Sequence, residues 1–195
     1  MTVDPITLLF ASIFTSNILL TNFLGMCSYI SISKDLKSSN GLGMAVSFVM
    51  TVTTVINWFV YHYIIVPFEL EYLRYIIFII VIAAVVQIME MIIDRISPTL
   101  YLNLGIFLPL ITVNCAILGV TLFMQIREYT LIQSLFYGLG SGLGWWLAIV
   151  LLAAIRKKTD NAPAPAGLKG NGLTFITIGI MAMAFMGFSG MIKVQ

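Results

Sequence analysis

Two cysteines, Cys27 and Cys115, are the residues of this chain best suited to carry chemistry. Each lies in a long stretch without a charged residue and follows a sequence that breaks helices: Cys27 comes after Gly25, and Cys115 comes six residues after Pro109. A thiolate binds transition metals, and little else in these apolar stretches could do so. The similar settings, 88 residues apart, suggest equivalent positions in two halves of one molecule.

The residues alone leave three interpretations of the cysteines open. Free cysteine is a common small apolar packing residue. A disulfide would form if the two alpha carbons came within about 6 Å of each other. Iron binding is the third interpretation: a [2Fe–2S] cluster takes four thiolates, so a chain with two would share the cluster with a partner that supplies two more.

Glu90 is a further candidate, because it is an ionisable residue inside an apolar run. Such residues usually mark ion or proton routes, which makes Glu90 a possible cation-handling group. It could equally be an interfacial carboxylate that reaches water beside Asp94 and Arg95. His62 lies between two tyrosines at the end of another run, where interfacial aromatic residues anchor a helix, and we expect it to be such an anchor.

The composition indicates a membrane protein. Of the 195 residues, 60% are hydrophobic and 9% are charged, and the mean hydropathy is +1.04. This composition leaves too little polar surface for a water-soluble globule, so we expect an all-α integral membrane protein with one domain, residues 1–195. The net charge of +2 does not indicate a nucleic-acid partner.

Charged residues divide the chain into six uncharged runs, at about 5–33, 38–68, 75–89, 96–126, 129–155 and 170–192. A helix needs about 20 apolar residues to cross the hydrocarbon core, so six transmembrane helices are expected; the third run continues past Glu90. The runs with the cysteines have about 30 residues and contain Gly or Pro, so their helices are expected to be interrupted. Straight helices would place Cys27 toward the cytoplasm and Cys115 toward the outside, and only unwinding would bring them level.

Lysine and arginine in the connections predict the orientation. Seven lie on one side and three on the other: Lys34, Lys37, Arg95, Arg156, Lys157, Lys158 and Lys169 against Arg74, Arg127 and Lys193. Cytoplasmic connections are richer in these residues, so both termini are expected outside the cytoplasm. The proline-containing segment 156–172 is expected to be a cytoplasmic loop.

An inverted repeat follows from this plan, because three spans on each side of residue 96 would have opposite orientations. We expect repeat 1 at about 1–95 and repeat 2 at about 96–195. Glycine-rich sequences at 40–43 and 137–144 open the second and fifth spans. The longer tract lacks the Lys-Ser/Thr ending of a phosphate-binding loop, and its glycines are spaced by four, which favours close helix packing.

Six blocks of the sequence are specific: 23–29 (FLGMCSY), 87–95 (QIMEMIIDR), 104–117 (LGIFLPLITVNCAI), 140–149 (GSGLGWWLAI), 154–156 (AIR) and 172–177 (GLTFIT). They resemble the membrane subunits of the Na+-translocating NADH:quinone reductase (Nqr) and of the related ferredoxin:NAD oxidoreductase (Rnf), almost from end to end. The sequences around the cysteines resemble the E-type subunits of Nqr. The short connection at 67–76 resembles the A-type subunits of Rnf, which are the alternative.

The resemblance implies a six-helix subunit of a six-subunit complex in the bacterial inner membrane. It implies pairing with a homologous subunit of opposite orientation, D-type in Nqr or E-type in Rnf. Cys27 and Cys115 would supply two of the four ligands of one [2Fe–2S] cluster, which relays electrons across the bilayer, coupled to transport of Na+ or H+. NADH, FAD, FMN and quinone would bind to other subunits, so this chain would hold no complete active site.

Two functions of other classes stay open. One is a secondary transporter that binds a small solute between its repeats, with cysteines that only pack. The other is a purely structural subunit. Colour separates them from the iron–sulfur function, because a complex with the cluster would be brown and would bleach on reduction.

Overall fold

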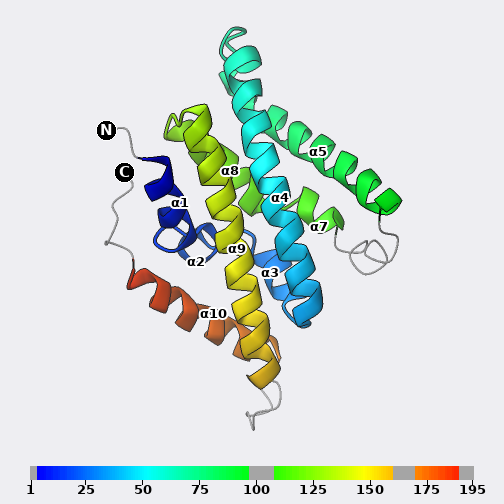
Figure 1. The fold of residues 1–195 in the computed structure, drawn as a ribbon, viewed down its shortest axis with the longest axis vertical. Helices are drawn as coiled ribbons and strands as arrows, with labels where there is room; N and C mark the ends of the chain where they lie inside the picture. The colour runs from blue at the N-terminus through cyan, green and yellow to red at the C-terminus, as the bar shows by residue number, and fades with distance from the viewer. Residues whose placement is uncertain (1–3, 97–107, 160–169, 189–195) are drawn as a thin grey trace.

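The computed structural model describes residues 4–96, 108–159 and 170–188, and every element in these ranges is helical (Figure 1). The elements are α1 (Pro5–Ile13), α2 (Ile18–Asn22), α3 (Met26–Ile32), α4 (Leu36–Val60), the π-helical turn η1 (Tyr61–Ile65), the 3₁₀ turn η2 (Glu71–Leu73), α5 (Arg74–Ile96), α7 (Leu108–Thr112), α8 (Cys115–Ile126), α9 (Leu131–Thr159) and α10 (Asn171–Met186). The all-helical prediction is confirmed for the described residues.

The first uncharged run forms three short helices, because two places in it do not continue a helix. The side chain of Asn17 accepts hydrogen bonds from the first backbone N–H groups of α2, at 3.1 and 3.4 Å, and so starts a new helix after α1. After α2, Phe23 (φ 54°) and Gly25 (φ 86°) have left-handed backbone conformations, which turn the chain before α3. The predicted interruption before Cys27 is present.

The fourth run is interrupted between α7 and α8. Pro109 does not make this break, since it lies inside α7. The break comes just before Cys115, where the side chain of Asn114 accepts a hydrogen bond from the backbone N–H of Ala116 at 3.0 Å and caps α8. The prediction of an interruption is confirmed, but its cause is the asparagine cap.

The long helices α4 and α9 lie side by side at the centre of the molecule, and the glycine tract of α9 allows close packing on two faces (Figure 1). A side chain at Gly142 would meet the Cα atom of Ser47 in α4 at 2.7 Å. A side chain at Gly144 would meet the carbonyl oxygen of Ile13, at the end of α1, at 3.0 Å. The packing role predicted for these glycines is confirmed.

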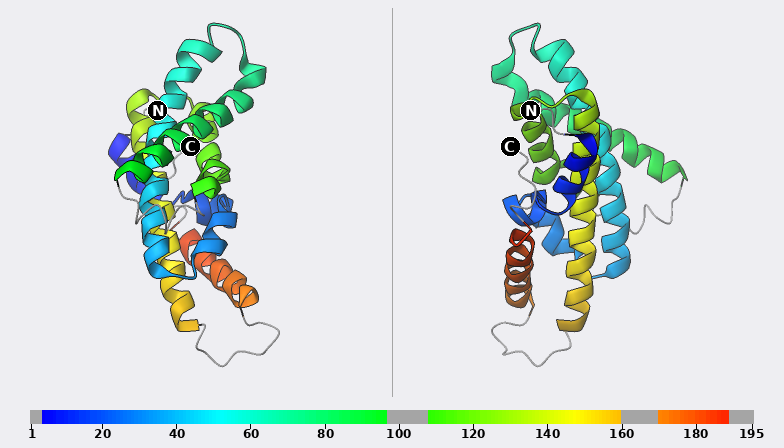
Figure 2. Two further views of the ribbon diagram at one scale, coloured as in Figure 1. Left: turned by 90° about the vertical axis from the view of Figure 1, so that its right-hand side faces the viewer. Right: turned by 60° about the vertical axis from the view of Figure 1, so that its left-hand side comes forward.

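Of the three long helices, α5 packs least extensively on the rest of the chain, and it extends away from the α4–α9 pair (Figure 2). One stripe of it packs inward, through the fully buried Phe78 and the nearly buried Ile82 and Val86. Its other faces carry exposed isoleucines, including Ile76 and Ile80. In a membrane such a surface meets lipid or another subunit.

Three helical segments are long and apolar enough to cross a membrane: Leu36–Ile65, Glu71–Ile92 and Leu131–Thr159. The shorter apolar segments Leu110–Ile126 and Asn171–Met186 and the broken first run correspond to the other three runs. The count of six spans and the inverted repeat therefore stay predictions.

One boundary differs from its prediction. The segment 156–172 does not begin as a loop, because α9 continues to Thr159 with Arg156 inside it. Arg156 is buried, with 4% of its surface exposed, so it belongs to the packed face of α9. Residues 160–169, with the prolines, lie outside the described residues.

Candidate functional site

Both cysteines lie in the first turn of a helix that begins after a break. Cys27 is the second residue of α3, and Cys115 is the first residue of α8. In both cases the chain must leave one helix and start another immediately before the cysteine. The breaks therefore place two thiols beside backbone N–H groups that have no partner inside a helix.

The two helix starts touch each other. The backbone N–H of Gly25 donates a hydrogen bond to Sγ of Cys115 at 2.9 Å, and Nδ2 of Asn114 donates one to Oγ of Ser28 at 3.3 Å. Cys27 lies between Gly25 and Ser28, so both cysteines lie where the two starts meet. The two interruptions thus bring the starts of α3 and α8 into contact.

Both thiols are free and exposed at the surface of the chain. No disulfide joins them, and neither cysteine packs in the interior of the chain itself. Beside Cys115, a groove of about 290 Å³ runs between α5, α7 and α8, with Ile82 and Leu118 among its walls. The site is open toward whatever surrounds the chain.

Gly25 holds the most crowded position of the site. A Cβ atom there would lie 2.8 Å from Nε1 of Trp145 and 3.0 Å from Oδ1 of Asn114, and its φ of 86° disfavours any side chain. Trp145 of α9 is fully buried behind it, and its Nε1 has no hydrogen-bond partner in the part of the chain that the structure describes. This indole closes the inner side of the site to water.

Arg156 fixes the other end of the helix that carries Cys27. Its Nη1 donates to the carbonyl oxygen of Ile30 at 2.9 Å and to Oγ of Ser33 at 2.7 Å, at the C-terminus of α3. A buried cation there also complements the negative end of the helix dipole. Helix α3 is thus held at its start by the hydrogen bond between Gly25 and Cys115, and at its end by the hydrogen bonds from Arg156.

The two thiols fit one half of the ligand set of a [2Fe–2S] cluster. Both are exposed, both lie at helix starts that contact each other, and one sulfur already accepts a backbone N–H bond, as cluster sulfurs do. Within residues 4–96, 108–159 and 170–188, no group of three or more His, Cys, Asp or Glu side chains could hold a metal. The described part of the chain therefore offers two cluster ligands, and two would have to come from elsewhere.

Glu90 is not part of this site. It lies on α5, eight residues beyond Ile82, which is about 12 Å along the helix axis. It continues the inward stripe of Ile82 and Val86 at a spacing of four, and it is half-buried. The carboxyl thus belongs to the face of α5 that packs on the chain.

Sequence reasoning found the cysteines but missed the residues that position them. Asn114 precedes Cys115 directly, and an asparagine before an apolar helix is a recognisable cap signal. Arg156 was hidden by its basic neighbours, which indicated a loop. Trp145 gave no signal beyond an apolar tract, since its contact with Gly25 joins residues 120 positions apart.

Comparisons with known proteins agree with this architecture. A family model described as "Rnf-Nqr subunit, membrane protein" matches residues 6–192. The chain is 52% identical, over 95% of its length and 96% of the relative's, to the E-type subunit of the Na(+)-translocating NADH-quinone reductase of Psychromonas ingrahamii. It is 51% identical, over 91% of its length and 78% of the relative's, to the protein of the same name from Chlamydia trachomatis serovar L2. The chain belongs to the Rnf-Nqr family of membrane subunits.

Proposed function

We propose that this chain is the E-type subunit of a Na+-translocating NADH:quinone reductase and that Cys27 and Cys115 are two of four ligands of a shared [2Fe–2S] cluster. The observation that carries the proposal is the contact between the starts of two interrupted helices, each of which carries an exposed thiol. Exposure leaves space for two further thiolates from a homologous subunit of opposite orientation. The names of the relatives favour Nqr over the A-type subunit of Rnf.

In this function the cluster, when bound, supplies one-electron transfer across the bilayer. The residues of the chain hold and tune it. Cys27 and Cys115 bind iron, and the N–H of Gly25 donates to a ligand sulfur, which favours the reduced state. The N-terminal end of α8 adds a positive partial charge at Cys115. Trp145 keeps water away from the inner side. NADH, FAD, FMN and quinone bind to other subunits of the complex.

The proposal includes six spans arranged as an inverted repeat in the bacterial inner membrane, with both termini in the periplasm. The ends of the central helices support this orientation. Lys34 and Lys37 lie at the start of α4, and Arg156, Lys157 and Lys158 lie at the end of α9, which is the same end of the molecule (Figure 1). Glu90, on the inward face of α5, is the proposed cation-handling group.

Removal of one ligand tests the proposal. In the assembled complex, Cys27→Ala and Cys115→Ala should each abolish one [2Fe–2S] signal in electron paramagnetic resonance of the reduced protein. Quinone reduction should fall at least about 100-fold, because outer-shell changes alone cost 10- to 100-fold at metal sites. Oxidation of NADH by artificial acceptors should continue, since it uses other subunits.

Val113→Ala is the matched control, because Val113 lines the same groove, is 74% exposed and has no side-chain atom that could bind iron. Full iron content and normal quinone reduction in Cys115→Ala would contradict the proposal. They would favour a secondary transporter, a function that two interrupted helices meeting at one point also support.

A further inference from the structure

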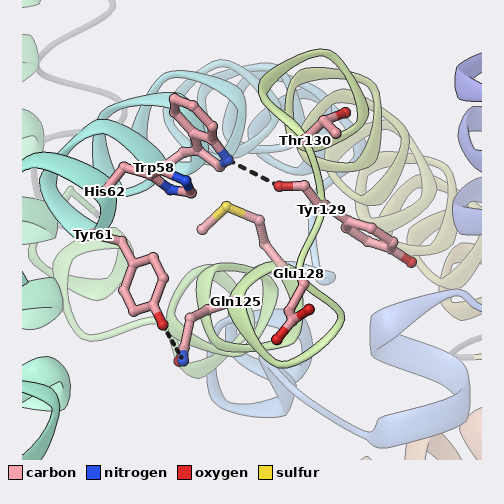
Figure 3. A pocket seen from close by; sticks show the side chains of 8 residues that line it. Trp58, Tyr61, His62, Gln125, Glu128, Tyr129 and Thr130 are labelled. Atoms are coloured by element: carbon pink, nitrogen blue, oxygen red, sulfur yellow. Dashed lines mark hydrogen bonds between the residues drawn. The ribbon is translucent and has the colours of Figure 1, made fainter. Parts of the chain in front are cut away.

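A second concave site lies at the other end of α8 from the cysteines. A cavity of about 420 Å³ opens between η1, the last turn of α8 and the connection to α9 (Figure 3). Its walls include Trp58, Tyr61, His62, Gln125, Glu128 and Tyr129. Helix α8 has 12 residues, or about 18 Å, so this cavity is separate from the site at Cys115.

The electrostatics of the cavity favour a cation. Glu128 carries the only permanent charge among the residues that line it. Helix α8 ends at Ile126, between the lining residues Gln125 and Glu128, so the negative end of its dipole lies beside the cavity. Arg127 does not line the cavity, and its guanidinium donates to the hydroxyl of Tyr129 at 3.1 Å.

Two amide side chains supply oxygen atoms without partners. Oε1 of Gln125 is buried and accepts no hydrogen bond from any described residue, while its Nε2 donates to the hydroxyl of Tyr61 at 3.3 Å. Asn57 lies one turn deeper on the same stripe of α4 as Tyr61 and is fully buried, and neither of its amide atoms has a partner in the described ranges. Buried amides without partners usually indicate water or an ion.

The walls are fixed before any ligand arrives. Nε1 of Trp58 donates to the carbonyl oxygen of Tyr129 at 2.9 Å, which ties α4 to the start of α9, and the ring of His62 stacks on Trp58 at 4.4 Å (Figure 3). The π-helical turn that begins at Tyr61 widens α4 here, and such turns are frequent at functional sites. His62 is thus a wall of a cavity, beyond the anchor that the sequence predicts.

We propose that this cavity binds a partly hydrated monovalent cation, with Glu128 supplying the charge and Gln125 supplying an amide oxygen at its wall. Each water occupies about 30 Å³, so the volume holds an ion with several waters and indicates a vestibule at the outer end of the chain. The assignment to Na+ rests on the proposed function, whereas the cavity and its unpaired oxygens do not. A lipid headgroup ammonium is the competing source of positive charge.

The test uses the purified complex with Na+ as the probe, at constant ionic strength with choline as the replacement cation. Gln125→Met and Glu128→Gln should each raise the Na+ concentration for half-maximal turnover about tenfold, which is about 1.4 kcal/mol. They should also reduce the Na+-dependent rise of the thermal unfolding midpoint. Gln125→Glu adds a charged oxygen at the same place. It should therefore lower the Na+ concentration for half-maximal turnover and increase the Na+-dependent rise of the thermal unfolding midpoint.

Glu71→Gln is the matched control, because Glu71 is exposed at the same end of the molecule and does not line the cavity. A Na+ response of the Gln125 and Glu128 variants equal to that of this control would overturn the proposal. An effect that is independent of Na+ and appears only in phosphatidylethanolamine vesicles, not in phosphatidylcholine vesicles, would assign the cavity to a headgroup. The [2Fe–2S] signal should persist in every variant. If the unmodified complex lacked this signal, the proposed function would be refuted. The Na+-dependent rise of the thermal unfolding midpoint would still test the cavity.

Discussion

Gly25 combines three requirements in one residue. Its left-handed backbone turns the chain, its missing side chain makes room for Trp145 and Asn114, and its N–H donates to Cys115. No other residue type satisfies the first two. The geometry of the cysteine pair therefore depends on a residue that binds no metal itself.

Gly25→Ala should destabilise the site, because a Cβ atom would collide with the indole and because alanine disfavours φ 86°. We expect a loss of about 1–3 kcal/mol, seen as a lower thermal unfolding midpoint of the complex. The [2Fe–2S] signal should weaken or shift in parallel. Gly179→Ala is the control, since nothing lies within 4 Å of that position. Equal midpoints for the two variants would show that the crowding at Gly25 is unimportant.

At the residue scale, sequence reasoning was strongest where chemistry requires a rare side chain. The chain has two cysteines in 195 residues, so both could be singled out from the sequence alone. The positioning residues Asn114, Trp145 and Arg156 are not marked by their type, because each acts through a contact with a segment that the fold brings close. Such contacts depend on where the helices break, and run lengths alone do not give that position.

At the scale of elements, α5 differs from the other long helices. It packs on the chain by one stripe and leaves its remaining faces exposed, and Glu90 continues that inward stripe. A half-buried carboxyl on the packed face of α5 is the basis for proposing Glu90 as a cation-handling group. A carboxylate that only anchors the helix at the membrane surface would instead lie on a face of α5 that is exposed to water.

Glu90→Gln should therefore raise the Na+ concentration for half-maximal turnover about tenfold, because one charge is lost from the route. The iron signal should stay unchanged, since Glu90 lies about 12 Å along α5 from the wall of the cysteine groove. Asp94→Asn, an exposed carboxylate one turn later on α5, is the control. If both variants keep the original Na+ dependence, Glu90 is an interfacial residue.

The elements themselves were largely predictable. Apolar runs bounded by charges gave the helices, and surplus length with Gly or Pro gave the interruptions. The details were less predictable: the break before Cys115 lies at Asn114 and not at Pro109, and α9 continues past Arg156. Both differences arise from hydrogen bonds of single side chains, which override the average tendency of a segment.

At the scale of the molecule, charge separates the two ends of the central helices. The basic cluster at the end of α9 and the lysines at the start of α4 share one end, while Arg74 and Arg127 lie at the other. This asymmetry is the physical basis for the proposed orientation, because cytoplasmic ends are enriched in lysine and arginine.

A pair of reporters fused after Gln195 checks the orientation. Alkaline phosphatase, which is active only outside the cytoplasm, should be active there, and a fluorescent protein that matures only in the cytoplasm should be dark. The same reporters placed after Lys158 should give the reverse. Fluorescence of the fusion after Gln195 would show that the C-terminus is cytoplasmic. The proposed orientation would then be wrong, and the cavity would lie on the cytoplasmic side.

The contacts of α1–α3 also constrain the order in which the protein can mature. Hydrogen bonds tie this region to residues made much later, among them those of Asn17 with Gly144, Gly25 with Cys115, Tyr29 with Ala148, and Arg156 with Ile30. A nascent chain that has just delivered residues 5–33 to the membrane has none of these partners, and bare broken helices would leave backbone groups unpaired in lipid. The contacts that hold both ends of α3 can therefore form only after Cys115 and Arg156 have been synthesised.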